Sequence, residues 1–252
     1  MKALLLSAGL GTRLRPLTES IPKCLVPIKG KPLMGYWLEL FCRTGITPVL
    51  VNLHYLSEQV EAYIKSNPNR EYVKTVYEEK LLGTGGTLLK NRAFFENDQI
   101  FLAHGDNLSI FNINAFINAH NSRPDGCEIT MMTFDTETPR NCGIVELDEN
   151  KMVCAFHEKV SNPPGNLANG AVYIMEPSIL GFLENFQKNT IDFSTEVLPY
   201  YLGKIYTYHN NLYHRDIGTI ESYQKAEIDF SVKTNLNFNS LETGINGKKI
   251  CL

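Results

Sequence analysis

Short apolar runs alternate with amphipathic stretches from the start of the chain. The run at 2–8 predicts a buried strand that ends in a glycine-rich loop. Residues 33–44 carry apolar side chains at helical spacing and stop at Gly45, which predicts a helix with a glycine C-cap. The same reasoning predicts further strands at 47–53, 73–77 and 99–103, and helices at 56–65 and after the glycines at 85–86.

The second half of the chain is richer in strand-like segments. Strands are predicted at 127–134, 143–147, 152–158 and 170–175, and helices at 178–185 and 219–232. Short strands that alternate with helices favour βαβ units, so we expect an α/β fold with a mixed, mostly parallel central sheet flanked by helices. No internal repeat is visible. From about residue 235 the sequence is polar and aperiodic, so residues 1–232 are predicted as one domain and 233–252 as a tail with little structure.

Composition narrows the classes of protein that fit this pattern. With 252 residues, 43% of them hydrophobic and 20% charged, the chain can bury a substantial core. A formal net charge of −3 does not predict the broad basic surface that nucleic acids require. The six cysteines show no metal-ligand spacing, and the first residues form too short an apolar run for a signal or membrane segment. We therefore expect a cytoplasmic protein with no membrane or nucleic-acid partner.

Two glycines mark the loop after the first predicted strand, which reads Gly9-Leu10-Gly11-Thr12-Arg13. Because glycine has no Cβ, backbone N–H groups in such a loop can approach an anion closely. Arg13 adds a planar set of donors that suits phosphate oxygens. The loop lacks the Gly-Lys-Ser/Thr of a Walker A motif, and Arg13 and Pro16 interrupt a dinucleotide-binding fingerprint. A tight turn without a ligand explains the two glycines equally well, so the loop alone does not identify a function.

The next motifs make the pattern specific. Residues 21–27 read IPKCLVP and are followed by Gly30-Lys31-Pro32. With the first loop they resemble the signature of the sugar-1-phosphate nucleotidyltransferase family, which includes mannose-1-phosphate and heptose-1-phosphate guanylyltransferases and glucose-1-phosphate thymidylyltransferases. The resemblance continues in order through 78–86 (EEKLLGTGG), 104–107 (HGDN), 156–159 (FHEK), 169–173 (NGAVY) and 215–219 (RDIGT). It implies a Rossmann-like nucleotidyltransferase fold over residues 1–232, with a smaller β-rich sugar-binding portion.

The residue types suit the reaction that the resemblance implies, in which a nucleoside triphosphate and a sugar 1-phosphate give an NDP-sugar and pyrophosphate. A phosphate monoester has a second pKa of about 6, so the attacking oxygen is mostly deprotonated at neutral pH and needs no general base. The two polyanions repel each other, and cations must neutralise them while they are held in line. We therefore expect arginine, lysine and a carboxylate-bound metal, and no nucleophile–His–acid triad.

The resemblance also implies roles for individual residues. Arg13 would hold the β- and γ-phosphates and Lys23 would contact the α-phosphate, as the catalytic pair, while Asp106 and Asp216 would bind Mg²⁺. The nucleotide would be bound by Ala8, Gly9, Gly11, Thr12, Glu78, Gly83 and Gly85, and the sugar phosphate by Gly143, Glu158, Lys159 and Asn169. The structural alternatives are a helix cap at Asp216, an ion pair between Glu158 and Lys159, a bulge at Gly143, a helix-entry loop at 83–86, a turn at Asn169, and surface positions for Arg13, Lys23 and Lys31.

The leading hypothesis is a guanylyltransferase that uses GTP and mannose 1-phosphate. The alternatives are a heptose-1-phosphate guanylyltransferase and a thymidylyl-, uridylyl- or cytidylyltransferase for another sugar. A family member that binds nucleotide sugars without turnover, and a metal-dependent glycosyltransferase, are further alternatives. The first is disfavoured because Arg13, Lys23, Asp106 and Asp216 are all present, and the second because the sequence lacks Asp-x-Asp after the strand. Relatives are often dimers or larger, so an oligomer is expected. The role of His104 stays open.

Overall fold

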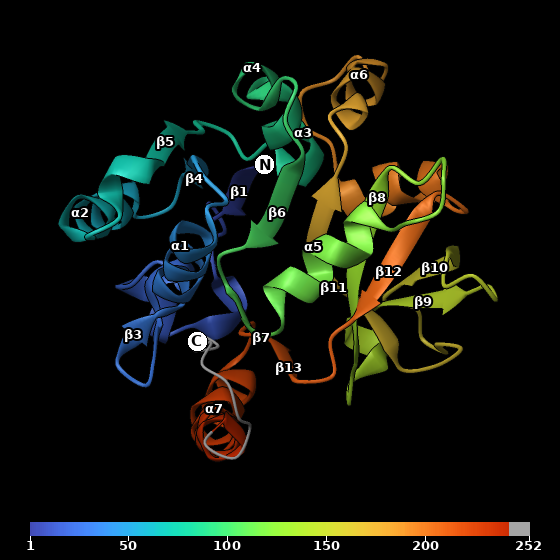
Figure 1. Ribbon diagram of the computed structural model, residues 1–252. Helices are drawn as coiled ribbons and strands as arrows, with labels where there is room; N and C mark the ends of the chain where they lie inside the picture. Colours follow the sequence, from blue (N-terminus) through green and yellow to red (C-terminus); the bar gives the residue numbers. More distant parts are fainter. Residues whose placement is uncertain (242–252) are drawn as a thin grey trace.

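A nine-stranded mixed sheet forms the centre of the computed structural model, which describes residues 1–241 (Figure 1). The strand order is β10-β9-β11-β6-β1-β4-β5, and β8 pairs with β11 and β12. The pairs β1–β4, β1–β6, β4–β5 and β8–β12 are parallel, and antiparallel pairing begins where β11 meets β6. The strands are β1 (Lys2–Leu6), β4 (Val49–Leu53), β5 (Val73–Tyr77), β6 (Ile100–His104), β8 (Ile129–Asp135), β9 (Gly143–Leu147), β10 (Val153–Glu158), β11 (Leu167–Met175) and β12 (Ile205–His209).

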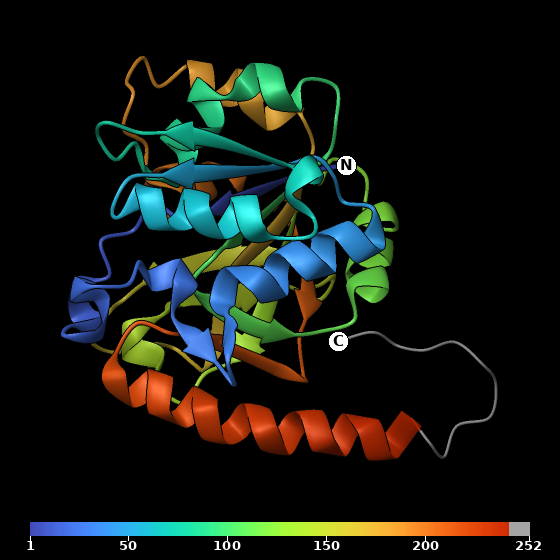
Figure 2. The ribbon, with the colours of Figure 1, turned by 90° about the vertical axis from the view of Figure 1, so that its left-hand side faces the viewer.

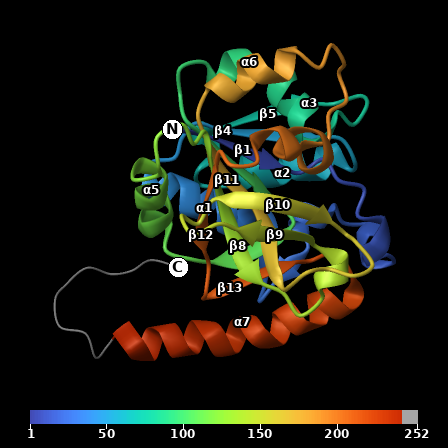
Figure 3. The same cartoon turned by 90° about the vertical axis from the view of Figure 1, so that its right-hand side faces the viewer.

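Helices flank the sheet, and two small antiparallel ribbons lie outside it (Figure 1). The ribbons are β2 (Pro27–Ile28) with β3 (Lys31–Pro32), and β7 (Asn107–Ile110) with β13 (Tyr213–Asp216). The helices are α1 (Leu33–Thr44), α2 (Ser57–Ser66), α3 (Gly83–Lys90), α4 (Arg92–Phe95), α5 (Ile113–Asn121), α6 (Ser178–Glu184) and α7 (Ile220–Leu241). The expected α/β fold is confirmed, and its antiparallel strands β9, β10 and β11 lie at one end of the sheet (Figure 3).

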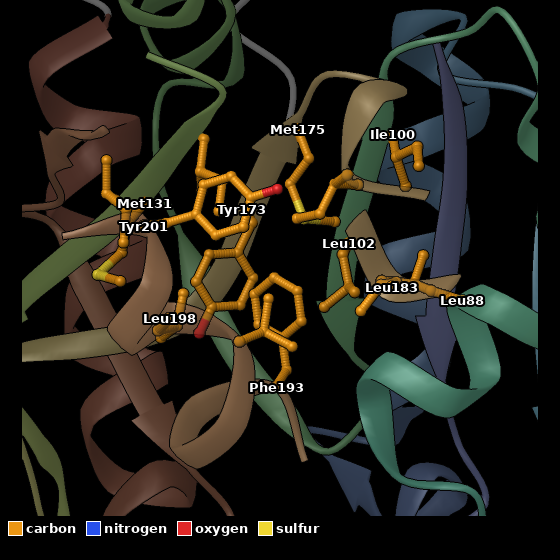
Figure 4. Packing of buried hydrophobic residues seen from close by; sticks show 14 of the residues in the cluster. Leu88, Ile100, Leu102, Met131, Tyr173, Met175, Leu183, Phe193, Leu198 and Tyr201 are labelled. Atoms are coloured by element: carbon orange, nitrogen blue, oxygen red, sulfur yellow. The ribbon is translucent and has the colours of Figure 1, made fainter. Parts of the chain in front are cut away.

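Side chains of alternate residues in the central strands enter two separate cores. Ala3 and Leu5 of β1 pack into a cluster under α1, α2 and α5, whereas Leu4 packs into a cluster under α3, α4 and α6. This follows from the two-residue period of a strand, which sends neighbouring side chains to opposite faces. A parallel strand covered on both faces must therefore be apolar throughout, which is why the run at 2–8 could be recognised as a strand, although β1 itself ends at Leu6. Figure 4 shows the second cluster, with Tyr173 and Phe193 at its centre.

A third cluster attaches α7 to the two small ribbons. Ala226 and Phe230 of α7 pack with Leu108 of β7 and Tyr213 of β13. In Figure 2 the helix crosses the whole lower edge of the molecule. The helix continues to Leu241, so the prediction of little structure from 233 is wrong for residues 233–241, while 242–252 lie outside the described residues. A helix nucleated by packing at its first turns propagates at little further cost, and no proline or glycine interrupts 233–241.

Several other elements differ from the sequence prediction. Helix α3 begins at Gly83, so the glycines at 85–86 lie inside its first turns and do not precede it. Helix α5, strands β12 and β13 and the π-helix η6 (Phe193–Val197) were not anticipated. Lys31 pairs with Glu39 of α1 and lies over the ring of Tyr36, so it anchors α1. Among the helices of residues 1–241, none is long and apolar enough to cross a membrane.

Candidate active site

A cavity of about 210 Å³ opens at the carboxyl ends of β1, β4 and β6. These strands are parallel, so the segments that follow them meet at one edge of the sheet. Ala8, Gly9, Glu78, Gly83 and Asp106 of the expected nucleotide-binding and metal-binding residues therefore line one cavity, whereas Gly11, Thr12, Gly85 and Asp216 are not among its walls. Its walls comprise Leu6, Ser7, Ala8, Gly9, Lys23, Cys24, Asn52, Glu78, Leu81, Gly83, Thr84, Thr87, His104 and Asp106.

The glycine-rich loop carries Arg13 outward at the side of this cavity. Gly11 has a φ of +63°, and a Cβ there would lie 3.0 Å from Cγ2 of Thr18. The hydroxyl of Thr18 donates to the Gly11 carbonyl at 2.7 Å and fixes the turn. The helical turn η1 (Thr12–Leu14) then begins, and the side chain of Arg13 is 66% exposed. Its guanidinium lies 3.8 Å from a carboxylate oxygen of Asp216 and is free to meet an incoming anion.

Lys23 joins the two expected metal-binding aspartates. Its Nζ lies 2.5 Å from Oδ2 of Asp106 and 3.1 Å from Oδ1 of Asp216, and its side chain is 9% exposed. Burial by itself lowers the pKa of Lys23, but the two carboxylates outweigh it and the pKa is raised. Burial would raise the pKa of Asp106, but the ammonium of Lys23 holds it below its usual value. Lys23 therefore stays protonated at neutral pH between the side chains of Asp106 and Asp216.

The ribbon of β7 and β13 brings the two aspartates together. Asp216 is paired with Asn107, the residue after Asp106, and the Ile217 amide donates to the Asp106 carbonyl at 3.2 Å. Mg²⁺ in phosphate-transfer sites is held by one or two carboxylates together with waters and substrate oxygens. Two carboxylates that share one ammonium fit that donor set. Among the residues that the structure describes, no three His, Cys, Asp or Glu side chains cluster as a complete metal site, so substrate oxygens would have to complete the coordination.

Glu78 lies at the inner end of the cavity in a buried hydrogen-bond network. Its carboxylate is 1% exposed and accepts from Asn52 Nδ2 at 3.1 Å, from the Thr87 hydroxyl at 2.6 Å and from the Leu82 amide at 3.2 Å. The side-chain oxygen Oδ1 of Asn52 accepts from the Ser7 amide at 2.7 Å. The network therefore connects the glycine-rich loop, β4 and α3. Sequence reasoning missed Asn52 and Thr87, although a polar residue within the apolar run of β4 was a visible signal.

The glycines at 83–86 begin α3, in line with the alternative of a helix-entry loop, and they also have a packing role that the sequence analysis did not predict. A Cβ on Gly86 would lie 2.1 Å from the carbonyl oxygen of Asn189, and one on Gly83 would lie 2.6 Å from that of Ile191. The Ile191 carbonyl accepts from the Gly85 amide at 3.0 Å, and the Ile191 amide donates to Leu82 at 2.9 Å. The absence of side chains thus lets the segment before η6 lie directly on α3. Only Gly83 of these glycines also lines the cavity.

The expected sugar-phosphate residues lie together on β9, β10 and β11, outside the walls of the cavity. Gly143 faces Glu158 across the β9–β10 pair, and a Cβ on Gly143 would be 2.7 Å from Oε2 of that glutamate. Lys159 pairs with Glu158 at 2.8 Å and is 62% exposed. Asn169 occupies a bulge of β11. Asn107, the residue after Asp106, connects the cavity to these sugar-phosphate residues, because its side-chain amide donates to the Gly170 carbonyl at 3.2 Å.

His104 lines the cavity beside Asp106, a placement that the sequence could not interpret. Burial lowers the pKa of its imidazole, so the ring is neutral at neutral pH.

Comparison with known proteins decides the family. A family model described as nucleotidyl transferase matches residues 2–231. The chain belongs to the nucleotidyl transferase family. The resemblance seen in the sequence motifs is thereby confirmed, and the match covers β1 to the middle of α7.

Two curated relatives of this nucleotidyl transferase have different printed activities. A mannose-1-phosphate guanylyltransferase of Mycobacterium tuberculosis is 32% identical over 232 residues, which are 90% of this chain and 64% of that protein. A UTP–glucose-1-phosphate uridylyltransferase of Synechocystis is 29% identical over 244 residues, which are 90% of this chain and 62% of that protein. The chain thus spans somewhat less than two-thirds of the length of either relative.

Solved structures with a similar fold agree with this family assignment. HddC from Yersinia pseudotuberculosis, solved in complex with GMP-PN, is 26% identical to this chain, with a TM-score of 0.76. The superposed region covers 91% of this chain and 99% of HddC. A structure from Bacillus anthracis at 18% identity has a TM-score of 0.79 and covers 99% of this chain and 98% of that chain, which shows a common fold.

Proposed function

We propose that this nucleotidyl transferase joins a nucleoside triphosphate to a sugar 1-phosphate and releases pyrophosphate. The observation that carries the proposal is the charge centre formed by Lys23, Asp106 and Asp216, of which Lys23 and Asp106 line a cavity together with Gly9 of the glycine-rich loop. An exposed arginine stands next to this centre. The site provides charge neutralisation and alignment, which are what the joining of two phosphates needs most.

In the proposed reaction an oxygen of the sugar 1-phosphate attacks the α-phosphorus of the triphosphate. The bond between the α-phosphorus and its bridging oxygen breaks, and pyrophosphate leaves with that electron pair. Arg13 binds the departing β- and γ-phosphates, and Lys23 moves from the carboxylates to the α-phosphate. Asp106 and Asp216 hold Mg²⁺, which when bound neutralises phosphate charge. No proton transfer is needed, because the attacking oxygen is already deprotonated at neutral pH.

GTP and mannose 1-phosphate are proposed as the substrates. The printed activity of the relative from Mycobacterium tuberculosis supports both. For the base, Glu78 supports guanine: a carboxylate accepts hydrogen bonds, and three protein donors leave it room for one more. Guanine can place one N–H of its N2 amino group on that position, with a second donor, N1–H, beside it. Uracil and thymine offer one N–H between two carbonyls, which a carboxylate would repel.

The test is a matrix of five nucleoside triphosphates against a panel of sugar 1-phosphates with Mg²⁺, read by pyrophosphate release. The largest kcat/KM is expected for GTP with mannose 1-phosphate. A higher value for another pair would replace the proposed substrates but keep the reaction. If no pair released pyrophosphate, a protein that binds nucleotide sugars without turnover would become the better interpretation.

Lys159→Ala is expected to raise KM for the sugar 1-phosphate about tenfold while KM for the triphosphate stays within about twofold. Its ammonium is exposed beside Glu158 and is proposed to meet the sugar phosphate as a point charge, and a charge-assisted hydrogen bond is worth about 1.5 kcal/mol or more. The matched control is Lys151→Ala, since both lysines are exposed and have a positive φ, and Lys151 lies on the turn before β10. Equal losses for both substrates would reject the proposed role of Lys159.

A further inference from the structure

Strand β11 contains a bulge at the centre of the expected sugar-phosphate site. The register of β11 against β8 shifts between Asn169 and Tyr173. Inside the shift, Ala171 has a φ of +51°, a left-handed conformation that residues with a Cβ rarely adopt. The Oδ1 atom of Asn169 accepts from the Ala171 amide at 2.9 Å and closes a turn across the bulge. Strained backbone of this kind is concentrated at ligand-binding sites and persists only where its surroundings hold it.

Two buried side chains outside the expected binding set hold this bulge. The hydroxyl of Tyr173 accepts a hydrogen bond from Nδ2 of Asn169 at 2.6 Å. Tyr173 itself is 1% exposed, and its ring packs on Phe193 with centroids 5.2 Å apart (Figure 4). From the other side, Asn107 donates to the Gly170 carbonyl, and its own carbonyl accepts from the Trp37 indole at 2.8 Å. Tyr173 belongs to the hydrophobic core and Asn107 to the ribbon strand β7, so the bulge is held from two sides.

These contacts determine which way the Asn169 amide faces. Nδ2 is directed to the tyrosine hydroxyl and Oδ1 to the Ala171 amide. Rotation by half a turn would place Nδ2 against the Ala171 N–H, donor against donor, so the Ala171 amide sets the orientation and the Tyr173 hydroxyl holds Nδ2 in it. The fixed amide keeps one N–H on Nδ2 and one lone pair on Oδ1 for a ligand. A donor and an acceptor side by side are what two neighbouring sugar hydroxyls require.

We propose that Tyr173 is a positioning residue for the sugar 1-phosphate, which acts by fixing the Asn169 amide. The inference rests on the proposed function, because it assigns Asn169 to the sugar side of that site. Tyr173 touches no substrate. Its hydroxyl connects the bulge to the hydrophobic core, so that the amide is oriented before the sugar arrives and no binding energy is spent on ordering it.

The experiment compares four proteins: the wild type, Tyr173→Phe, Asn169→Ala and the double variant. Tyr173→Phe is expected to raise KM for the sugar 1-phosphate about fivefold to tenfold, with KM for the triphosphate and kcat within about twofold of the wild type. In the Asn169→Ala background the same substitution is expected to have no further effect, because the amide through which it acts is gone. Tyr208→Phe is the matched control, since this tyrosine packs on Phe116 of α5 and is expected to leave all constants unchanged.

Three outcomes would overturn the inference. One is an unchanged KM for the sugar 1-phosphate in Tyr173→Phe. Another is an additive effect of the two substitutions, and the third is a loss of folding at the assay temperature, which would make the hydroxyl a stability group. Each of these three outcomes can be interpreted only if the wild-type protein is active. A wild type without activity on any substrate pair would instead count against the proposed function, so the two failures are distinguishable.

Discussion

Asp106→Asn is expected to lower kcat about 100-fold to 1,000-fold, and Asp216→Asn is expected to have an effect of the same order. Each substitution removes one of the two carboxylates that surround Lys23 and are proposed to hold Mg²⁺. Loss of the phosphate neutralisation provided by the ion corresponds to several kcal/mol in the transition state, and each ~1.4 kcal/mol is tenfold in rate. Asparagine has nearly the same shape as aspartate, so the fold should persist. The measurements are pyrophosphate release and, separately, binding of Mn²⁺ in the presence of the triphosphate.

Asp98→Asn serves as the control for this pair. Asp98 also faces a lysine, Lys2, at 2.9 Å, but it lies at the amino ends of β1 and β6, opposite the cavity. An exposed ion pair of this kind contributes about 0–1 kcal/mol to stability, so the variant should keep the wild-type rate. Near-normal turnover in Asp106→Asn or in Asp216→Asn would remove that aspartate from the metal site.

Gly86→Ala is expected to lower the free energy of unfolding by about 2–4 kcal/mol and the melting temperature by on the order of 5–15 °C. The added Cβ would lie 2.1 Å from the Asn189 carbonyl oxygen, which belongs to backbone and cannot rotate away. The segment that contains Ile191 would have to leave α3, with loss of the hydrogen bonds from Gly85 and to Leu82. Because α3 carries Thr84 and Thr87 of the cavity wall, KM for the triphosphate should rise as well. Chemical denaturation and nucleotide titration measure the two effects.

The helical Gly181 provides a matched control with the opposite expected sign. Alanine is favoured over glycine within a helix by about 0.5–1 kcal/mol, and a Cβ on Gly181 of α6 meets no atom within 4 Å. Gly181→Ala should therefore be neutral or stabilising. If Gly86→Ala were also neutral, α3 and the segment at 189–191 could not be packed as closely as the structure has them.

Elements whose sequence signal lies within the element itself could be predicted, and elements that depend on distant segments could not. Helix α1 was predicted with its true bounds because its apolar spacing and its terminal glycine are contained in the helix itself. Strand β1 was equally readable, since burial on both faces leaves a continuous apolar run. Helix α3 was placed too late because glycine is a poor helix former. Its helical state depends on the segment at 189–191, about a hundred residues away.

In the candidate site, too, short motifs could be recognised in the sequence and contacts between distant segments could not. Arg13, Lys23, Asp106 and Asp216 could be named from motifs, because each motif is a short run of residue types that phosphate chemistry demands. The contact between these residues could not be predicted from the sequence. It depends on the pairing of β7 with β13 and on Lys23, which belongs to a third segment. Asn52 could be seen as a polar residue in an apolar strand, but its partner Glu78 could not.

The sequence by itself determined the α/β class, most of the central strands, the family and the residue types that neutralise phosphate. It could do so because hydrophobic periodicity and phosphate-binding loops are encoded over a few consecutive residues. Only the tertiary structure decided which carboxylates share one lysine, which glycines serve packing, and how Tyr173 and Asn107 hold the strained bulge at Ala171. Those features rest on hydrogen bonds and contacts between segments far apart in the chain, whose geometry exists only after the sheet has formed.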